Sequence, residues 1–273
     1  LKNMHPKHLL AKYNLEPKRS LGQNFLFDPH VLKRIVDAAE ISAVDQVLEI
    51  GPGLGSLTKQ LARRAGRVVA VELDGRFLPI LKDELAENDH VQLVHGDILE
   101  QNLDDLFQGS YKVVANVPYY ITGSILRHLL SSVNKPEIMV LTVQKEVAQR
   151  VTAVPPHMSL LSVSVQYYGQ VQILFTIKAG AFWPRPDVDS AVVRIDINSH
   201  AAAELAQEQE FFRIARAGFS QKRKQLQKNL RQLGLSKAEI AAALKKVDID
   251  GSRRAETLSL REWRMLSSVL NQD

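Results

Sequence analysis

Four consecutive residues, Asn116-Val117-Pro118-Tyr119, combine the groups needed to hold a planar base by its exocyclic amine. They follow an apolar run at 111–115 that is typical of a buried parallel strand. The lone pair of an adenine N6 is delocalised into the ring, so the amine is a poor nucleophile until its pyramidal form is favoured. The Asn116 side-chain oxygen and the Val117 carbonyl could accept the two amine hydrogens, because Pro118 biases Val117 toward an extended conformation. Tyr119 could stack on the base, which is worth about 1–3 kcal/mol. The tetrapeptide therefore points to methylation of adenine at N6.

An isolated tetrapeptide of this kind also has a simpler explanation. A strand that ends in an Asn/Pro turn, with a core tyrosine after it, would contain the same residue types and is the more common case. The decision therefore rests on the segments upstream, whose order along the chain must fit the same chemistry.

The first expected strand of the chain, at 46–50, is followed by a glycine-rich turn. Gly51, Gly53 and Gly55 permit a tight turn and close approach of a ligand to the backbone, and a helix is expected at about 56–64. The spacing is not the G-x-G-x-x-G that a dinucleotide fold prefers for its pyrophosphate. S-adenosylmethionine carries no phosphate, so this loop needs only to admit its amino-acid and ribose parts.

Acidic residues end the next two expected strands. Glu72 ends the strand at 67–72, about 20 residues after the glycines, where a ribose diol is normally held. Asp97 follows the strand at 91–95 and could accept a hydrogen bond from the cofactor's adenine amine, with Ile98 packed on the ring. Taken singly, Glu72 also fits a surface carboxylate, and Asp97 a turn residue or helix N-cap. Their order favours a ligand site, because the carboxyl ends of strands in an open α/β sheet share one edge.

Four segments, in this order, closely resemble the ribosomal RNA adenine dimethyltransferases: 20–26 (SLGQNFL), 49–55 (EIGPGLG), 116–119 (NVPY) and 182–190 (FWPRPDVDS). The similarity is closest to the bacterial small-subunit enzymes of the KsgA type and extends over about 18–270. It implies a Rossmann-like class I S-adenosylmethionine-dependent methyltransferase domain with a small C-terminal all-helical domain. It also implies transfer of four methyl groups to two adjacent adenosines near the 3′ end of 16S (small-subunit) ribosomal RNA.

The resemblance further assigns roles to single residues. Phe182 matches the family position of a second aromatic wall for the target base. Contacts with the cofactor are implied for Gln23, Asn24, Leu26, Gly51, Gly53, Glu72, Leu73, Asp97, Ile98 and Asn116.

The chain departs from the family pattern at three places. The stretch 150–159 is about two residues shorter than in many family members and lacks their usual glycine and tyrosine, and it borders the target side in the family. Val117 stands where leucine is commoner, and Tyr120 where a small or polar residue is usual. Neither substitution removes an acceptor or the stacking ring.

Composition excludes several other kinds of site. The chain has no cysteine, so it has no disulfide, thiolate metal site or cysteine nucleophile. The histidines lack metal-ligand spacing, and we expect His95, His128 and His157 to be packing or surface groups. No apolar stretch approaches about 18 residues and no signal peptide is visible. We therefore expect a cytoplasmic protein that takes no membrane or metal partner, and we expect a monomer.

The positive charge is concentrated in the C-terminal part. Residues 201–273 carry 14 basic and 9 acidic side chains, a surplus that equals the whole formal net charge of +5. The densest run is 220–231, where leucines recur at helical spacing, so we expect one packed face and one wet basic face. Such a run is usually a solvated helix face, but beside a base-modifying site it favours RNA phosphate contacts by Lys222, Arg223, Lys224 and Lys228.

The layout of expected elements divides the chain in two. Alternating strands and helices up to 197 predict a mostly parallel, doubly wound sheet with an antiparallel closing pair. We expect a catalytic domain at 1–198, with a cofactor-covering segment at 18–27, a linker at 198–203, and a helical RNA-binding domain at 204–273. Within the last, Ser236-x-x-Glu239 and Ser259-x-x-Glu262 are capping boxes.

Three classes of function are compatible with these observations. The small-subunit enzyme is favoured over the large-subunit ribosomal RNA methyltransferase that confers macrolide resistance, because of the basic four-helix tail. A non-catalytic ribosome-assembly factor is disfavoured by the intact Glu72, Asp97, Asn116 and Tyr119, although a second, assembly role is compatible with them. A dehydrogenase is disfavoured by the glycine spacing and by the lack of an evident hydride-transfer acid.

Overall fold

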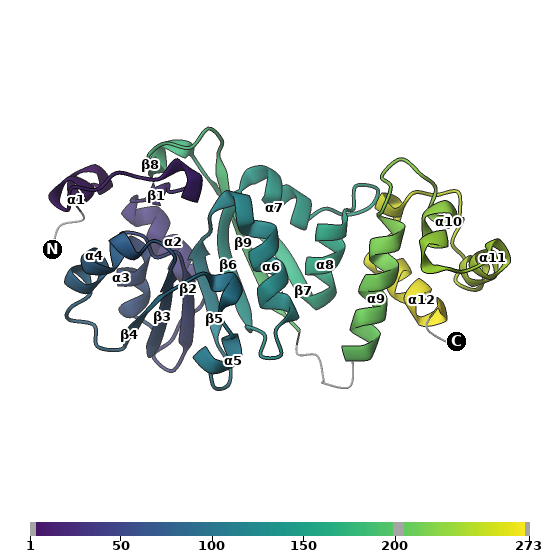
Figure 1. Cartoon of the computed structure of the whole chain (residues 1–273), viewed down its shortest axis with the longest axis horizontal. Coiled ribbons are helices and arrows are strands. Elements are labelled where there is room, and N and C mark those ends of the chain that lie inside the picture. The colour runs from purple at the N-terminus through teal and green to yellow at the C-terminus, as the bar shows by residue number, and fades with distance from the viewer. Residues whose placement is uncertain (1–3, 199–204, 271–273) are drawn as a thin grey trace. The chain divides into compact units, whose positions relative to one another are not determined.

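The computed structural model describes residues 4–198 and 205–270, which form two compact units (Figure 1). The first unit comprises Leu1–Ala148 and Gln170–Ile197, and the second comprises Gln149–Gly169 and Asn198–Asp273. This division differs from the expected boundary at 198, since 149–169 groups with the C-terminal helices. The expected linker lies, apart from its first residue, outside the described residues.

The first unit is built on a seven-stranded sheet with the order β4-β3-β2-β5-β6-β9-β7. β2 pairs in parallel with β3 and β5, β3 with β4, and β5 with β6, whereas β9 lies antiparallel to β6. The mostly parallel, doubly wound sheet is therefore confirmed. The strands are β2 (Gln46–Ile50), β3 (Arg67–Glu72), β4 (Val91–His95), β5 (Lys112–Asn116), β6 (Ile138–Gln144), β7 (Gly169–Ile177) and β9 (Ser190–Ile197).

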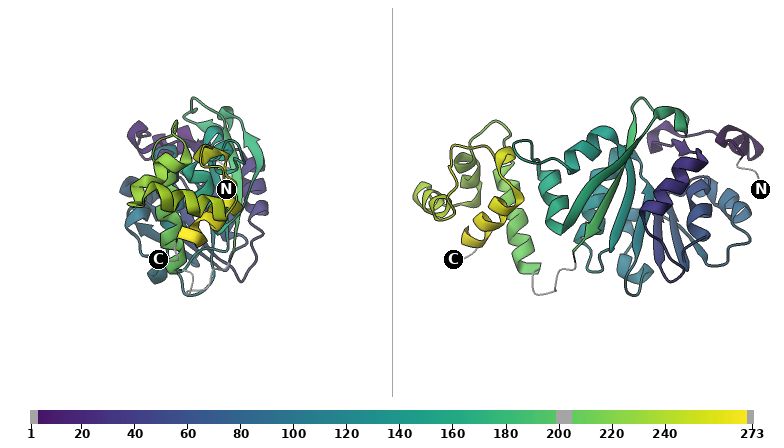
Figure 2. Two further views of the ribbon diagram at one scale, coloured as in Figure 1. Left: turned by 90° about the vertical axis from the view of Figure 1, so that its right-hand side faces the viewer. Right: turned by 180° about the vertical axis from the view of Figure 1, so that it is seen from behind.

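Helices cover both faces of this sheet. α2 (Pro29–Ala38) lies on one face and α6 (Thr122–Ser131) on the other, as the front and rear views show (Figures 1 and 2). α2 begins at Pro29 because Asp28, its N-cap, accepts hydrogen bonds from the N–H groups of His30 and Val31. Its apolar side packs with α3 (Ser56–Ala62) onto buried strand valines of the core.

The N-terminal segment lies at the edge of the sheet that carries β3 and β4. α1 (Pro6–Lys12) inserts Leu9 and Leu10 into an apolar cluster with side chains of η2 (Gly75–Phe77) and α4 (Leu78–Glu84). The chain then passes through η1 (Arg19–Leu21) to β1 (Phe25–Leu26), which pairs antiparallel with β8 (Phe182–Trp183). Residues 15–24 are therefore fixed at both ends by packing or strand pairing.

The second unit is helical, as predicted. α8 (Leu160–Tyr168) joins α9 (Leu205–Gly218) and α12 (Leu260–Leu270), with Tyr167 and Phe211 rings in contact at 4.4 Å between centroids. The Ser236 capping box opens α11 (Lys237–Lys246), and reciprocal hydrogen bonds between Ser259 and Glu262 open α12, so both predicted boxes are confirmed.

The predicted basic helix at 220–231 is wrong. Lys222, Arg223 and Lys224 lie in turns, and the helix α10 covers only Leu226–Asn229, followed by η7 (Leu230–Leu233). The backbone N–H groups of Leu226 and Gln227 donate to the carbonyls of Arg253 and Gly251, so they cannot extend a helix from residues 222–223. The buried Asn229 amide also donates to the Gly218 and Gln221 carbonyls, which fixes the turn.

Six further short elements connect the strands and helices described above. No helix among residues 4–198 and 205–270 is both long and apolar enough to cross a membrane. The connecting elements are η3 (Ile98–Glu100), α5 (Leu103–Leu106), η4 (Tyr119–Ile121), α7 (Lys145–Val151), η5 (Ala179–Ala181) and η8 (Ala255–Thr257).

Candidate active site

A pocket in the first unit lies at the carboxyl ends of β2, β3 and β5. The chain order reverses between β2 and β5, which is where open α/β sheets bind ligands. All but one of the catalytic and cofactor residues expected from the sequence line this pocket: Gln23, Asn24, Leu26, Gly51, Gly53, Glu72, Leu73, Asp97, Ile98, Asn116, Val117, Pro118 and Tyr119.

The glycine loop brings bare backbone to the pocket wall. Gly51 and Gly53 have φ values of 67° and 55°, in the left-handed region that glycine adopts without steric cost. A Cβ at Gly51 would meet no atom within 4 Å, so the pocket is open beside it. A Cβ at Gly53 would lie 3.0 Å from the Phe25 ring, so this residue also lets β1 approach the loop.

Glu72 connects the end of β3 to this loop. Its Oε2 accepts the Gly53 N–H at 2.9 Å and its Oε1 accepts the Asp74 N–H at 2.8 Å. The residue is 6% exposed, and burial raises the pKa of its carboxyl group against the lowering effect of these hydrogen bonds. Each carboxylate oxygen keeps a second acceptor site, so Glu72 can still receive a diol.

Glu49 is a second buried carboxyl group at the pocket. In the sequence it stood out only as the first residue of the segment 49–55. It is 1% exposed, and its Oε2 has no hydrogen-bond partner among the described residues. Burial, with a smaller contribution from the nearby Glu72 charge, raises its pKa to about 8. Glu49 is therefore mainly protonated near neutral pH.

Asp97 both lines the pocket and forms the N-cap of the short helix η3. Its Oδ1 accepts the Leu99 N–H at 2.9 Å, which makes it the N-cap of η3, the structural alternative left open by the sequence. The same residue lines the pocket beside the buried Ile98. An N-cap uses one carboxylate oxygen, so the two roles are compatible.

Asn116 ends β5 with its amide held in one orientation. The Asn116 Nδ2 donates to the Asn24 carbonyl at 3.1 Å, so Oδ1 is the amide atom that remains to accept a hydrogen bond in the pocket. Next along the chain, Val117 is 2% exposed and its N–H donates to the Thr142 carbonyl of β6. Strand pairing thus positions both oxygens proposed for the target amine.

Tyr119 is half-buried, and its hydroxyl lies 2.6 Å from the buried Ser190 Oγ at the start of β9. Burial raises the pKa of Tyr119, so the phenol remains protonated at neutral pH. The hydroxyl is thereby tied to the sheet, which fixes the position of the outer end of the ring. In the sequence Ser190 stood out only as the last residue of the segment 182–190. Its contact with Tyr119 could not be predicted without knowing how the strands pair.

Phe182 and Tyr120, two further aromatic residues singled out in the sequence, differ in exposure. Phe182 is 3% exposed, pairs with Leu26 across β8 and β1, and is not among the residues lining the pocket. Tyr120 does line the pocket and is 57% exposed. Its place at the pocket was not predicted, because the sequence singled out Tyr120 only as a departure from the family pattern.

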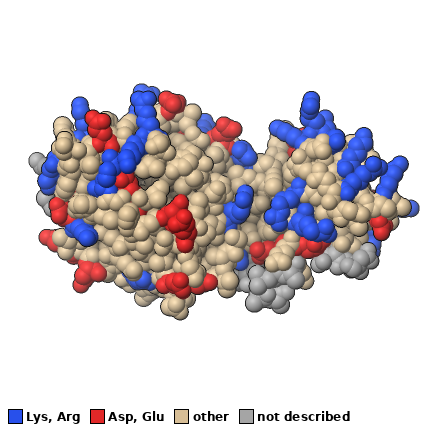
Figure 3. All heavy atoms as spheres, in the orientation of Figure 1, with Lys and Arg blue, Asp and Glu red and all other residues tan. Residues whose placement is uncertain are grey.

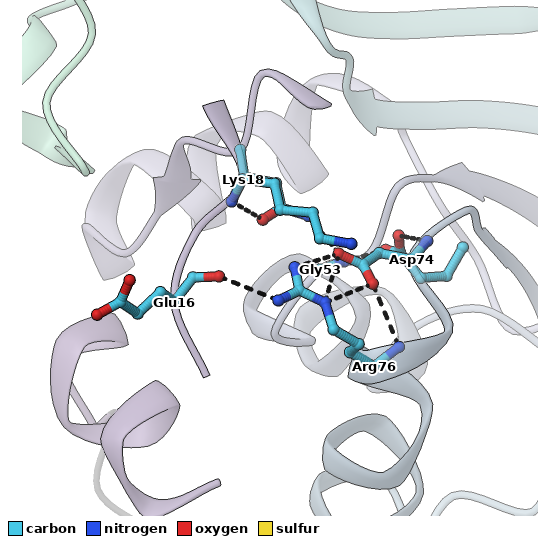
Figure 4. Close-up of polar contacts among 7 residues, drawn as sticks. Glu16, Lys18, Gly53, Asp74 and Arg76 are labelled. Atoms are coloured by element: carbon cyan, nitrogen blue, oxygen red, sulfur yellow. Dashed lines mark hydrogen bonds and ion pairs between the residues drawn. The ribbon is translucent and has the colours of Figure 1, made fainter. Parts of the chain in front are cut away.

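A polar network around Asp74 also escaped the sequence reasoning. Asp74 Oδ2 accepts Gln23 Nε2 at 2.8 Å, and Arg76 donates to both Asp74 oxygens (Figure 4). The only sequence signal was the position of Asp74 two residues after Glu72, which suits the N-cap of η2 that it forms. The network connects the N-terminal segment to the end of β3.

The pocket fits S-adenosylmethionine by its donor set. A buried carboxylate for hydroxyl groups, an open backbone at Gly51, an acidic acceptor beside apolar Ile98 and no phosphate-spaced glycines match its ribose, amino-acid and adenine parts. In the described part of the chain no group of three or more His, Cys, Asp or Glu side chains could hold a metal ion.

The residues expected to contact RNA lie on the second unit. Lys222, Arg223, Lys224 and Lys228 are all exposed. Figure 3 shows Lys and Arg side chains spread over the visible face of this unit. The cofactor pocket and these cations thus belong to different units of the chain.

Comparisons with known proteins agree with this geometry. The family model described as ribosomal RNA adenine dimethylase matches residues 14–272. The ribosomal RNA small subunit methyltransferase A of Dehalococcoides mccartyi is 42% identical over 270 residues, covering 98% of this chain and 93% of that protein.

Two solved structures share the fold at low but informative identity. A dimethyladenosine transferase from Plasmodium falciparum aligns with a TM-score of 0.77 at 25% identity, covering 90% of this chain and 96% of the other. The 23S rRNA methyltransferase ErmE aligns with a TM-score of 0.74 at 26% identity, covering 91% and 100%. The fold is therefore that of a class I methyltransferase with a C-terminal helical part. The chain belongs to the ribosomal RNA adenine dimethylase family of S-adenosylmethionine-dependent methyltransferases.

Proposed function

We propose that the protein methylates N6 of two adjacent adenosines near the 3′ end of small-subunit ribosomal RNA. The observation that carries this proposal is the fixed Asn116 amide, whose Nδ2 is held by the Asn24 carbonyl so that Oδ1 is left to accept. With the Val117 carbonyl as the second acceptor, an adenine amine held there would be favoured in its pyramidal form. Such stabilisation acts mainly on the transition state.

Each residue of the site has a defined task in this proposal. S-adenosylmethionine supplies an electrophilic methyl group; Glu72 and Asp97 hold its ribose and adenine, and Gln23 and Asn24 lie across it. Tyr119, fixed through Ser190, stacks on the target base. Amide oxygens are too weakly basic to keep a proton, so the proton that N6 loses with each methyl passes to water.

Substrate selection is assigned to the basic surface of the second unit. Besides the cations at 222–224, a small groove there is lined by Lys228, Arg231 and Lys237, together with Gln227 and Ile240. The one nearby carboxylate on α11, that of Glu239, is turned onto the Ser236 N–H, which keeps it committed to the cap. Exposed cations of this kind suit the phosphates of folded RNA.

The test is methylation of defined ribosomal particles. Small-subunit and large-subunit particles from cells lacking the gene for this protein are incubated with it and labelled S-adenosylmethionine, and the modified nucleotides are mapped by mass spectrometry. We expect two adjacent N6-dimethyladenosines in small-subunit RNA and no label in large-subunit RNA. Label at an adenosine of large-subunit RNA would establish the macrolide-resistance type of activity instead, and absence of any label with intact binding would favour an assembly factor. We also expect the enzyme to act as a monomer on a 30S assembly intermediate in the cytoplasm.

A further inference from the structure

Residues 15–24 form a strap across the pocket, anchored at both ends but exposed between them. At its start, Leu9 and Leu10 of α1 are buried against η2 and α4, and the Tyr13 hydroxyl donates to Asp83. At its end, Phe25 and Leu26 pair with β8. Between these anchors Glu16, Lys18, Arg19 and Ser20 are exposed, while Leu21 to Asn24 line the pocket.

Few hydrogen bonds attach the strap to the body of the unit. At its far end the Asn24 carbonyl accepts Asn116 Nδ2 at 3.1 Å. In its middle, Gln23 Nε2 donates to Asp74 Oδ2 at 2.8 Å, and Arg76 Nη1 donates to the Glu16 carbonyl at 3.3 Å. Two of these three attachments therefore involve one ion pair, Asp74 with Arg76.

That ion pair is built to keep both attachments in register. Arg76 Nε and Nη2 donate to the two Asp74 oxygens at 2.9 and 2.6 Å, a bidentate geometry that fixes both side chains. The Asp74 side chain is 4% exposed and that of Arg76 is 31% exposed. The charged hydrogen bond from Arg76 holds the pKa of Asp74 well below its usual range.

The same pair touches the expected ribose site and the inner turn of the strap. The Asp74 N–H donates to Glu72 Oε1 at 2.8 Å, and Glu72 Oε2 accepts the Gly53 N–H. On the strap, Gln23 Oε1 accepts the Lys18 N–H at 2.6 Å, so one amide side chain closes the strap on itself and on Asp74. Figure 4 shows these contacts converging between the strap and the loop after β3.

We propose that Asp74 and Arg76 form a clasp that holds the strap closed over the cofactor, so that both are positioning residues for cofactor retention. Entry and release of the cofactor then require the clasp to open while α1 and β1 stay in place. The proposal rests on the proposed function only for the identity of the molecule retained. The catalytic acceptors at Asn116 and Val117 are not part of the clasp.

The strap carries its own reporter of opening. Trypsin cleaves after Lys18 and Arg19, both exposed, but a protease must locally unfold the strap before its backbone fits the active site. We compare the rate of cleavage at these two positions in the wild type, Arg76→Gln and Gln23→Ala, without cofactor. Gln23→Ala removes the side chain by which the strap binds Asp74 and leaves the residues of the clasp unchanged.

Both variants are expected to be cleaved about tenfold faster than the wild type, which corresponds to ~1.4 kcal/mol in the opening equilibrium. Arg63→Gln is the matched control, because Arg63 is an exposed arginine of the same unit that contacts only Gln60 among the hydrogen bonds of the described residues. Its cleavage rate should equal that of the wild type. The cleavage rate of Arg76→Lys, which keeps the charge but loses the bidentate geometry, should lie between those of the wild type and Arg76→Gln.

Calorimetric titration with S-adenosylmethionine supplies the second readout. We expect about tenfold weaker binding and a raised cofactor KM for Arg76→Gln, with kcat at saturating cofactor changed less than about twofold. Glu16→Gln should bind as the wild type does, since only the Glu16 carbonyl joins the clasp and its carboxylate points away (Figure 4).

The outcomes separate this proposal from the proposed function. Wild-type rates of cleavage and wild-type cofactor affinity in both Arg76→Gln and Gln23→Ala would overturn the clasp. A fall in kcat with unchanged affinity would also overturn it, because the pair would then act on the catalytic motif. If the wild type bound no S-adenosylmethionine, the proposed function would fail, but the cleavage rates measured without cofactor would still decide whether the clasp exists.

Discussion

The pocket of the first unit and the basic surface of the second show two different ways of building a binding site. In the pocket, side chains are buried or half-buried and are held by backbone groups: Glu72 by two N–H groups and Asn116 by a carbonyl. On the basic surface, Lys222, Arg223 and Lys224 are exposed and lie in turns. The first arrangement holds individual side-chain atoms in place, whereas the second provides a region of positive charge without holding any one cation in place.

This difference sets how each site should respond to substitution. A group held by the backbone acts at one position on one atom, so its loss should be large and specific to one step. Exposed charges act together through a screened field, so their losses should be small singly and should depend on salt. The following predictions test this contrast, beginning with the largest effect.

Replacing Asn116 should have the largest effect on chemistry. Asn116→Ala removes an acceptor that matters most as N6 becomes pyramidal, and loss of one such preorganised group costs about 10²–10³ in kcat. Single-turnover methyl transfer and particle binding, measured side by side, should show the rate falling far more than RNA affinity. Equal losses in both would mean that the pocket binds the base without favouring its transition state.

Glu72 should govern cofactor affinity. Glu72→Ala should weaken S-adenosylmethionine binding by about 1.5–3 kcal/mol, the range for hydrogen bonds to a charged group. Because Glu72 also accepts the Gly53 and Asp74 N–H groups, part of this loss will come from a looser glycine loop. Calorimetric titration measures this loss, and Glu100→Ala is the control, because Glu100 is an exposed carboxylate of η3 that is not among the residues lining the pocket. Unchanged affinity in a folded Glu72→Ala would contradict the ribose assignment.

The same contrast explains how far the sequence could predict the structure. The sheet, its parallel order and the pocket followed from apolar runs that each end in a polar residue, since strand ends must share an edge. The links from Ser190 to Tyr119 and from Asp74 to Gln23 could not be predicted, because each joins residues 51 or more positions apart. The basic helix was wrong for the same reason: the donors that end it pair with carbonyls at 251 and 253, which no local pattern shows.

On the basic surface, three charges changed together should produce a moderate effect that depends on salt. Lys222→Gln, Arg223→Gln and Lys224→Gln remove exposed cations from turns, so no helix is at risk. We expect particle binding weakened by about 1–3 kcal/mol at low salt, a shallower slope of log affinity against log salt, and unchanged S-adenosylmethionine affinity. Lys82→Gln, an exposed lysine of the first unit, is the control. Superimposable salt curves would assign no RNA contact to 222–224 and direct attention to 150–159.

Glu49 tests whether the pocket is a low-dielectric site. Its pKa rises from 4.5 when unfolded to about 8 when folded, so between these values the folded state keeps a proton that the unfolded state has released. Stability should therefore fall as pH rises from about 4.5 to 8, by at most ~1.4 kcal/mol per pH unit for this group. Urea unfolding at pH 5.5, 6.5 and 7.5 should show a flatter pH dependence for Glu49→Gln than for the wild type. Parallel curves would show that Glu49 stays ionised, with a partner that the pocket does not reveal.

The smallest expected effect is loss of the Tyr119 hydroxyl, and it tests how tightly the pocket holds its parts. Tyr119→Phe keeps the stacking face and loses the bond to Ser190, and a neutral hydrogen bond contributes about 0.5–1.5 kcal/mol. Methyl transfer should fall less than about tenfold, and Ser190→Ala should reproduce the fall, because both changes break the same contact. Tyr119→Ala should cost clearly more, since it also removes the ring. Single-turnover rates for the three variants and the double variant Tyr119→Phe/Ser190→Ala measure the coupling. If Tyr119→Phe were as damaging as Tyr119→Ala, the hydroxyl and not the ring face would be the working group, and the pocket would depend on a polar contact that stacking does not explain.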